Sequence, residues 1–231
     1  MTEKADVSGK ALDSLPMRIA ASLAERIIRG TLKPGDRVRQ DEIASDFNAS
    51  HVPVREAFRQ LESRGLLVSR VRKGVYVSPL DQASLVEITR MRTALEVLAL
   101  RYAIPNLSDE DIALAEKLSK QADSSKDMST WEEANRRFHL CLYRPCEMPR
   151  VLHGIETLHE ARLRYMYATA TIIDWNPTSQ DEHREIIAAV KTRDIARACS
   201  LLEKHIVEAG DVLLAASGAL SAQRTVSGQP S

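Results

Sequence analysis

The sequence of 231 residues is poor in aromatic side chains, glycine, proline and cysteine, and each shortage excludes a class of protein. Aromatic residues make up 4%, which argues against a single-strand binder that stacks bases. Nine glycines and nine prolines leave little room for a sandwich or barrel rich in turns. Three cysteines without a CxxC pair favour reduced thiols over a disulfide framework.

Long apolar runs are also missing. No segment approaches the length needed to cross a bilayer, so we expect no membrane partner. The polar start, MTEKADVSGK, lacks the apolar core of a secretory signal. Together with the unpaired cysteines, this predicts a cytoplasmic protein.

Charge is balanced overall but divided unevenly along the chain. The sequence has 32 Lys/Arg and 32 Asp/Glu, yet residues 1–80 hold 14 basic and 10 acidic side chains. The remainder carries the opposite excess. Such a split suggests that the first half meets a polyanion and the second does not.

The expected organisation has two domains and two polar ends. We predict a disordered N-terminus over residues 1–14 and a disordered tail over residues 220–231. Between them lie a first domain at 15–80, closed by Pro79, and a second at 81–219. The fold class is mainly α.

The first domain reads as a winged helix-turn-helix. Apolar periodicity and breakers predict helices over about 15–30, 40–47 and 50–64, and alternation over 66–78 predicts a β-hairpin wing. In the third helix, Val54, Ala57, Phe58 and Leu61 share the face that would pack on the core.

A different face of the third helix carries a basic stripe. His51, Arg55 and Arg59 are spaced at i, i+4 and i+8, so their side chains could enter a major groove. Ser50 can cap this helix, and Pro53 is tolerated in its first turn. The whole expected DNA-contacting set is Arg37, Arg39, Ser50, His51, Pro53, Arg55, Arg59, Arg72, Lys73 and Gly74. The competing interpretation is a solvated basic face on an ordinary helical domain.

Residues 30–77 resemble the winged-helix domain of GntR-family transcription regulators. The resemblance is carried by G-x-L-x-P-G at Gly30–Gly35, PVREA at Pro53–Ala57, L-x-x-x-G-L at Leu61–Leu66, and Gly74-Val75. It implies that Arg55 contacts a base or a phosphate, with Ser50, His51 and Gly74 nearby. The family usually has Arg where this sequence has His51.

The second domain shows no strand signal, and its breakers predict a six-helix bundle. The expected helices span about 82–103, 108–124, 129–143, 148–173, 178–192 and 193–219. Three of them place a histidine on an apolar face: His139, with Asn135 one turn before it, His183 and His205. These groups could converge on a divalent metal such as Zn, Ni, Fe or Mn, or each could be a separately satisfied core residue. His153 and His159 are expected to be structural or exposed.

Arg92 also lies on an apolar face and needs an anion. Two partners are possible. One is a fixed ion pair with Glu96 at i+4, and the other is a carboxylate ligand held by two hydrogen bonds.

The second domain resembles the ligand-binding domain of the FadR subfamily of GntR regulators. Arg92-x-x-x-Glu96, Asn135-x-x-Phe138-His139, Glu182-His183-Arg184 and His205 carry this resemblance. It implies a helical bundle whose metal, bound by one Asp and three His, receives a small organic acid together with a pocket arginine. Here Asn135 stands where Asp is usual, and six helices resemble the VanR-like branch.

The combined prediction is a homodimeric, DNA-binding repressor in the cytoplasm, on the nucleoid, that senses a small carboxylate through a metal in its helical bundle. Two alternatives stay open. One is a DNA-binding module whose ligand-free bundle only dimerises. The other is a metal-dependent hydrolase, although the sequence has no nucleophile motif, HExxH or phosphate loop, so we expect no enzyme.

Overall fold

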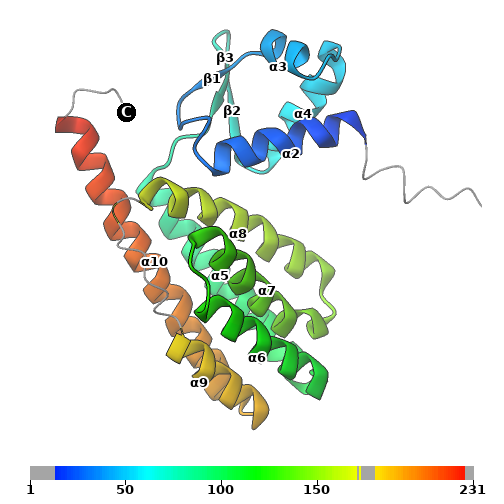
Figure 1. Cartoon of the computed structure of the whole chain (residues 1–231), viewed down its shortest axis with the longest axis vertical. Helices are drawn as coiled ribbons and strands as arrows, with labels where there is room; N and C mark the ends of the chain where they lie inside the picture. The colour runs from blue at the N-terminus through cyan, green and yellow to red at the C-terminus, as the bar shows by residue number, and fades with distance from the viewer. Residues whose placement is uncertain (1–13, 171, 173–179, 227–231) are drawn as a thin grey trace, which may run out of the picture. The chain divides into compact units, whose positions relative to one another are not determined.

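The computed structural model describes residues 14–170, 172 and 180–226 (Figure 1). Within these ranges the chain forms two compact units that divide between Leu80 and Asp81. In the same ranges no helix is both long enough and apolar enough to span a bilayer. The mainly helical fold with an N-terminal winged helix-turn-helix, predicted from the sequence, is confirmed.

The first unit contains three helices and three short strands. These are α2 (Leu15–Ile28), β1 (Arg37–Val38), α3 (Gln40–Asp46), α4 (His51–Ser63), β2 (Leu67–Arg70) and β3 (Gly74–Val77). Its core forms because α2 and α4 each present one apolar face to the other. Ile19 and Leu23 of α2 and Val54 and Leu61 of α4 are all fully buried.

The wing contains one strand more than the sequence predicts. The strand order is β1-β3-β2, and β1 pairs antiparallel with β3 through Arg37 opposite Tyr76 and Val38 opposite Val75. A strand of two residues has no periodicity of its own, so alternation could not reveal it. The predicted turn is present, with Arg72 at φ 60° and Gly74 at φ 105°.

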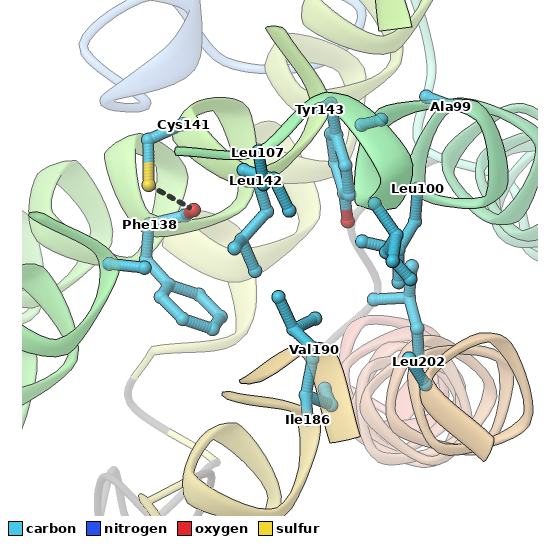
Figure 2. Close-up of a cluster of buried hydrophobic side chains, with 14 of the residues drawn as sticks. Ala99, Leu100, Leu107, Phe138, Cys141, Leu142, Tyr143, Ile186, Val190 and Leu202 are labelled. Atoms are coloured by element: carbon cyan, nitrogen blue, oxygen red, sulfur yellow. Dashed lines mark hydrogen bonds between the residues drawn. The ribbon is translucent and has the colours of Figure 1, made fainter. Parts of the chain in front are cut away.

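The second unit, within the described ranges, has the six α-helices that the sequence predicts and two short 3-10 turns. They are α5 (Gln82–Ala103), η1 (Ile104–Asn106), α6 (Asp109–Asp123), α7 (Met128–Tyr143), η2 (Arg144–Cys146), α8 (Pro149–Thr169), α9 (Gln180–Lys191) and α10 (Ile195–Val226). Figure 2 shows part of the core, in which Leu100 of α5, Phe138 and Leu142 of α7, Ile186 of α9 and Leu202 of α10 belong to one buried cluster.

Some predicted ends differ from the observed ones. The helix expected over 148–173 ends at Thr169, and α10 runs to Val226. Residues 220–226 are therefore helical, whereas the sequence assigns them to a disordered tail. The predicted disordered residues 1–13 and 227–231, and the start of the helix expected at 178, lie outside the described residues.

Candidate functional site

The basic stripe on α4 lies on its exposed face. His51, Arg55 and Arg59 are exposed, whereas Val54, Ala57, Phe58 and Leu61, on the other face, are buried. The connection from α3 turns sharply at Asn48, which has φ 47°. The two helices thus form a helix-turn-helix that presents three basic or ionisable groups to solvent along one helix face.

The start of α4 differs from expectation in one detail. Ser50 occupies the N-cap position with an extended backbone, but its side chain accepts no capping hydrogen bond. Its hydroxyl is exposed. Pro53 is half-buried in the first turn, as its missing N–H allows.

The wing carries the remaining basic groups. Arg72, Lys73 and Gly74 are exposed at the β2–β3 turn. A Cβ on Gly74 would lie 3.2 Å from Nε of Arg37, so the pairing of β1 with β3 places Arg37 at this turn. Arg70, at the other side of the turn, stacks over the Tyr76 ring with its Cζ 4.6 Å from the ring centre, and so helps to order the wing.

Two predicted DNA-contacting side chains have acidic neighbours. Nε of the exposed Arg39 lies 3.6 Å from a carboxylate oxygen of Glu42. Nε2 of His51 lies 3.7 Å from a carboxylate oxygen of Asp41. Both contacts are between exposed side chains, so solvent competes for them and neither prevents a contact with phosphate.

The second unit brings together the three histidines that the sequence analysis singles out. His139 of α7, His183 of α9 and His205 of α10 are all buried, and one nitrogen of each lies within 4.8 Å of the others. Helices α7, α9 and α10 thus build one site from distant parts of the chain (Figure 1). Three imidazoles at this separation suit the coordination of a transition metal.

The partners of His139 determine which of its nitrogens carries the proton. The Tyr143 hydroxyl donates to Oε2 of Glu96 at 2.7 Å, so its oxygen is left to accept. Nδ1 of His139 lies 3.1 Å from that oxygen and therefore donates to it. Consequently Nε2 of His139 holds a lone pair.

His205 is oriented in the same way by a different carboxylate. Its Nδ1 lies 2.6 Å from Oε2 of Glu182, which only accepts, so Nδ1 carries a proton, and in the neutral ring Nε2 holds the lone pair. The two Nε2 atoms of His139 and His205 are 3.3 Å apart. Two lone pairs facing each other repel, and a cation bound by both removes that repulsion.

The remaining groups of the site have buried polar atoms without a partner. Neither ring nitrogen of His183, which is fully buried, makes a hydrogen bond, and the same is true of Oδ1 of Asn135. Burial, followed by the neighbouring histidines, holds the pKa of His139 and of His183 well below the usual value. Both rings are therefore neutral, the form in which imidazole binds a metal. These atoms fit a metal with three nitrogen ligands and one amide oxygen.

Arg92 forms an ion pair with Glu96, the first of the two partners expected for it. Its Nε donates to Oε1 of Glu96 at 2.7 Å, and both side chains are buried. Burial alone would raise the pKa of Glu96, but Arg92 and His159 outweigh it and hold that pKa well below its usual value. Glu96 thus contacts both Arg92 and Tyr143, and Tyr143 in turn contacts His139.

Sequence reasoning missed two neighbours of this cluster. His159 is 1% exposed, with its ring centre 6.2 Å from that of His139. Arg162, one turn further along α8, pairs with buried Glu132 of α7 at 3.3 Å. The available signal was the i, i+3 spacing of His159 and Arg162, but α8 carries polar side chains on several faces, so periodicity did not distinguish the inward ones.

One unit has an exposed basic helix and wing, and the helical second unit holds a buried cluster of three histidines suited to binding a metal. This combination defines a DNA-binding transcription regulator. Comparison with known proteins agrees. Residues 15–77 match the family described as bacterial regulatory proteins, gntR family, and residues 87–208 match the FCD domain. The chain belongs to the GntR family, in its FadR subfamily, which consists of transcription regulators and not of enzymes.

Curated relatives and solved structures support this assignment over most of the chain. The HTH-type transcriptional regulator McbR of Escherichia coli K12 is 33% identical over 192 residues, covering 78% of this chain and 84% of McbR. The HTH-type transcriptional repressor GlaR of the same organism is 29% identical over 196 residues, covering 80% and 89%. The structure of E. coli McbR/YncC superposes with a TM-score of 0.73 at 26% identity, over 87% of this chain and 97% of that one.

Proposed function

We propose that this GntR-family regulator is a repressor whose helical domain senses a small carboxylate through a bound divalent metal. One observation carries the proposal: the Nε2 lone pairs of His139 and His205 face each other at 3.3 Å inside the protein. With both rings neutral, Tyr143 and Glu182 hold their protons on the opposite nitrogens, so the two Nε2 atoms need a cation between them, either a proton or a metal ion. The unpartnered ring nitrogens of His183 favour the metal, because a proton shared by His139 and His205 leaves them unsatisfied.

The metal would be held by His139, His183 and His205, with Asn135 as the fourth ligand. Imidazole and amide donors suit Zn, Ni, Fe or Mn. Tyr143 and Glu182 orient two of the three rings from behind, as is usual for histidine ligands in metal sites. When bound, the metal supplies a positive centre with open positions that accept a carboxylate oxygen.

Arg92 is the second proposed contact for the effector. Because its Nε is committed to Glu96, a carboxylate would meet the terminal nitrogens of the guanidinium. Arg92 lies on α5, the first element after the boundary at Leu80. A shift of Arg92 and Glu96 would therefore act on the helix that directly follows the DNA-binding unit in the chain.

The DNA-binding half of the proposal assigns the operator contacts to the exposed face of α4 and to the wing. Arg55 and Arg59 would reach base edges or phosphates, and Arg37, Arg72 and Lys73 would contact the backbone. One recognition helix reads too few base pairs for genomic specificity, so we propose a homodimer on a pseudo-palindromic operator. Operator binding would place the protein on the nucleoid.

One observation favours the alternative in which the bundle only dimerises. Arg92 already has a carboxylate partner in Glu96, so it does not require a ligand to neutralise its charge. That alternative gives no role to the unpartnered nitrogens of His183 or to Oδ1 of Asn135. The metal proposal gives the unpartnered atoms a role as ligands. It also gives the Arg92–Glu96 pair a role, since Glu96 positions Tyr143 behind His139.

The test measures operator binding by the full-length protein. A duplex is selected from a random pool, and its binding is monitored by fluorescence anisotropy. Arg55→Ala should weaken binding by about 1–3 kcal/mol, while Arg101→Ala, an equal loss of charge on α5, should not. A panel of small carboxylates is then added to protein loaded with Zn²⁺ or Ni²⁺ and to chelated protein. We expect release only from the loaded protein. Equal response of both forms would remove the metal from the proposal.

A further inference from the structure

The buried polar atoms that lack a partner are concentrated in one region of the second unit. Among the described residues they belong to four side chains: Asn135, His159, Arg162 and His183. Two of these, Asn135 and His183, are accounted for by the proposed metal. The other two, His159 and Arg162, lie one turn apart on α8 and have no role in that site.

Arg162 is a buried cation with an unused donor. The residue is 6% exposed, Nη2 lies 3.3 Å from Oε1 of Glu132, and Nε has no partner. Burial, followed by the charge of Arg92, lowers the pKa of Arg162 to about 10, so a second buried cation stands close by. A buried N–H of a charged group without an acceptor is costly, and an anion is the partner that suits it.

His159, one turn before Arg162 on α8, is also close to His139. Both of its ring nitrogens lack hydrogen bonds, and its Nε2 is 3.5 Å from Oε1 of Glu96, beyond a good hydrogen bond. Its ring centre is 6.2 Å from that of His139. An anion accepting from Arg162 would thus lie beside a ring that can donate to it, close to the metal ligands.

The charge of the cluster argues in the same direction. Among the described residues of the second unit, the buried charged side chains other than histidine are three arginines, Arg92, Arg162 and Arg164, and two carboxylates, Glu96 and Glu132. Because Asn135 is neutral, a divalent metal would bring two positive charges with no anion among its ligands. In a buried site such a charge needs compensation, and a ligand with two negative groups matches it.

We propose that Arg162 and His159 form a second anion-binding subsite beside the metal, and that the effector is a dicarboxylate. One carboxylate binds the metal and Arg92. The other accepts from Nε of Arg162 and from the His159 ring. This inference rests on the proposed function for the first carboxylate, whereas the second is recognised by α8 alone.

The test is calorimetric titration of the Ni²⁺-loaded full-length protein with matched acids: succinate against butyrate, and glutarate against valerate. Hydrogen bonds to a charged group predict that each dicarboxylate binds roughly 10- to 100-fold more tightly than its monocarboxylate partner. Arg162→Gln should remove this preference and leave the monocarboxylates unchanged. Arg150→Gln, an exposed position on the same helix, should keep it.

A second variant keeps the test valid if Arg162→Gln fails to fold around Glu132. Arg162→Lys retains the positive charge but has no Nε donor, and it too should lose most of the preference. Equal binding of mono- and dicarboxylates by the wild type, or an unchanged preference in the folded Arg162 variants, would overturn the inference.

Failure of the metal site is distinguished by elemental analysis of the same samples. Metal-loaded protein that binds both acid classes equally contradicts only the second subsite. Protein that takes up no metal, yet loses a dicarboxylate preference in Arg162→Gln, supports the subsite and contradicts the metal.

Discussion

The Tyr143 hydroxyl donates to Glu96 at 2.7 Å and accepts from His139. One phenol therefore sets the tautomer of the histidine that lies one turn before it on the same helix. The two residues are i and i+4 on α7, and Glu96 lies on α5. Burial, followed by the charge of Glu96, raises the pKa of Tyr143 well above its usual value, so the phenol keeps its proton and remains a donor.

Tyr143→Phe should therefore lower metal affinity without removing a ligand. His139 would lose the acceptor that holds its proton on Nδ1, and losing such a partner typically costs about 10- to 100-fold in affinity. Competition against a chromophoric chelator measures the change. Tyr102→Phe, at a position that is 52% exposed, is the matched control and should bind like wild type. Wild-type affinity in Tyr143→Phe would mean that the tautomer is set by another group.

Asn135→Asp should raise metal affinity. Oδ1 of Asn135 has no partner and is buried beside His139 on the same face of α7, where a carboxylate would add a negative charge close to the cation. We expect at least about a tenfold gain in the same competition assay, equivalent to about 1.4 kcal/mol. Unchanged affinity would place residue 135 outside the coordination sphere.

Arg92→Ala should destabilise the second domain by about 3–5 kcal/mol, because it leaves the buried Glu96 carboxylate without its cation. The double variant Arg92→Met/Glu96→Gln removes both charges and should recover most of this loss. Urea denaturation measures the free energy of unfolding. Arg136→Ala, which breaks the more exposed pair with Glu133, should cost less than about 1 kcal/mol. A loss that small for Arg92→Ala would contradict the buried ion pair.

The stability of the metal-free protein should fall with acid. Burial, followed by the charge of Arg92, lowers the pKa of His159 from 6.5 to about 4. Arg162 also lowers this pKa, and Glu96 opposes the shift without overcoming it. The unfolded state therefore binds a proton first, and stability is full above about pH 6.5 and declines towards pH 4. The shift corresponds to about 3 kcal/mol from this residue.

The pH dependence is measured by urea denaturation of chelated protein between pH 7.5 and 5, a window of about 2.5 units around the unfolded pKa. His139 and His183 contribute with the same sign, since their pKa values are also lowered. His159→Gln should flatten the profile, and the exposed His153→Gln should not. A His159→Gln profile as steep as that of wild type would show that His159 titrates normally in the folded state.

Periodicity predicted most of the helices because their apolar faces are regular: Val54, Phe58 and Leu61 on α4 and Ile186 and Val190 on α9 are buried as their spacing requires. It also predicted that His139, His183 and His205 point inward. It could not find β1, which has two residues, or the end of α10, where no breaker stops the helix.

The partners of the histidines could not be predicted either. Tyr143 meets Glu96 across 47 positions of sequence, and Arg162 meets Glu132 across 30, and spacing within one helix carries no information on such contacts. The Glu182–His205 contact likewise joins α9 to α10. Local pattern determined which side chains face inward, and only the packing of the helices determined which of them meet.

Native mass spectrometry of the full-length protein after reconstitution with Zn²⁺ or Ni²⁺ tests the central claim most directly. We expect a dimer that carries one metal per subunit, and a His183→Ala variant, which loses a ligand, that carries far less. Metal-loaded wild type should also melt at a higher temperature than the chelated protein, because the ion binds only the folded state. A wild-type spectrum with less than ~0.1 metal per subunit would contradict the one-site account.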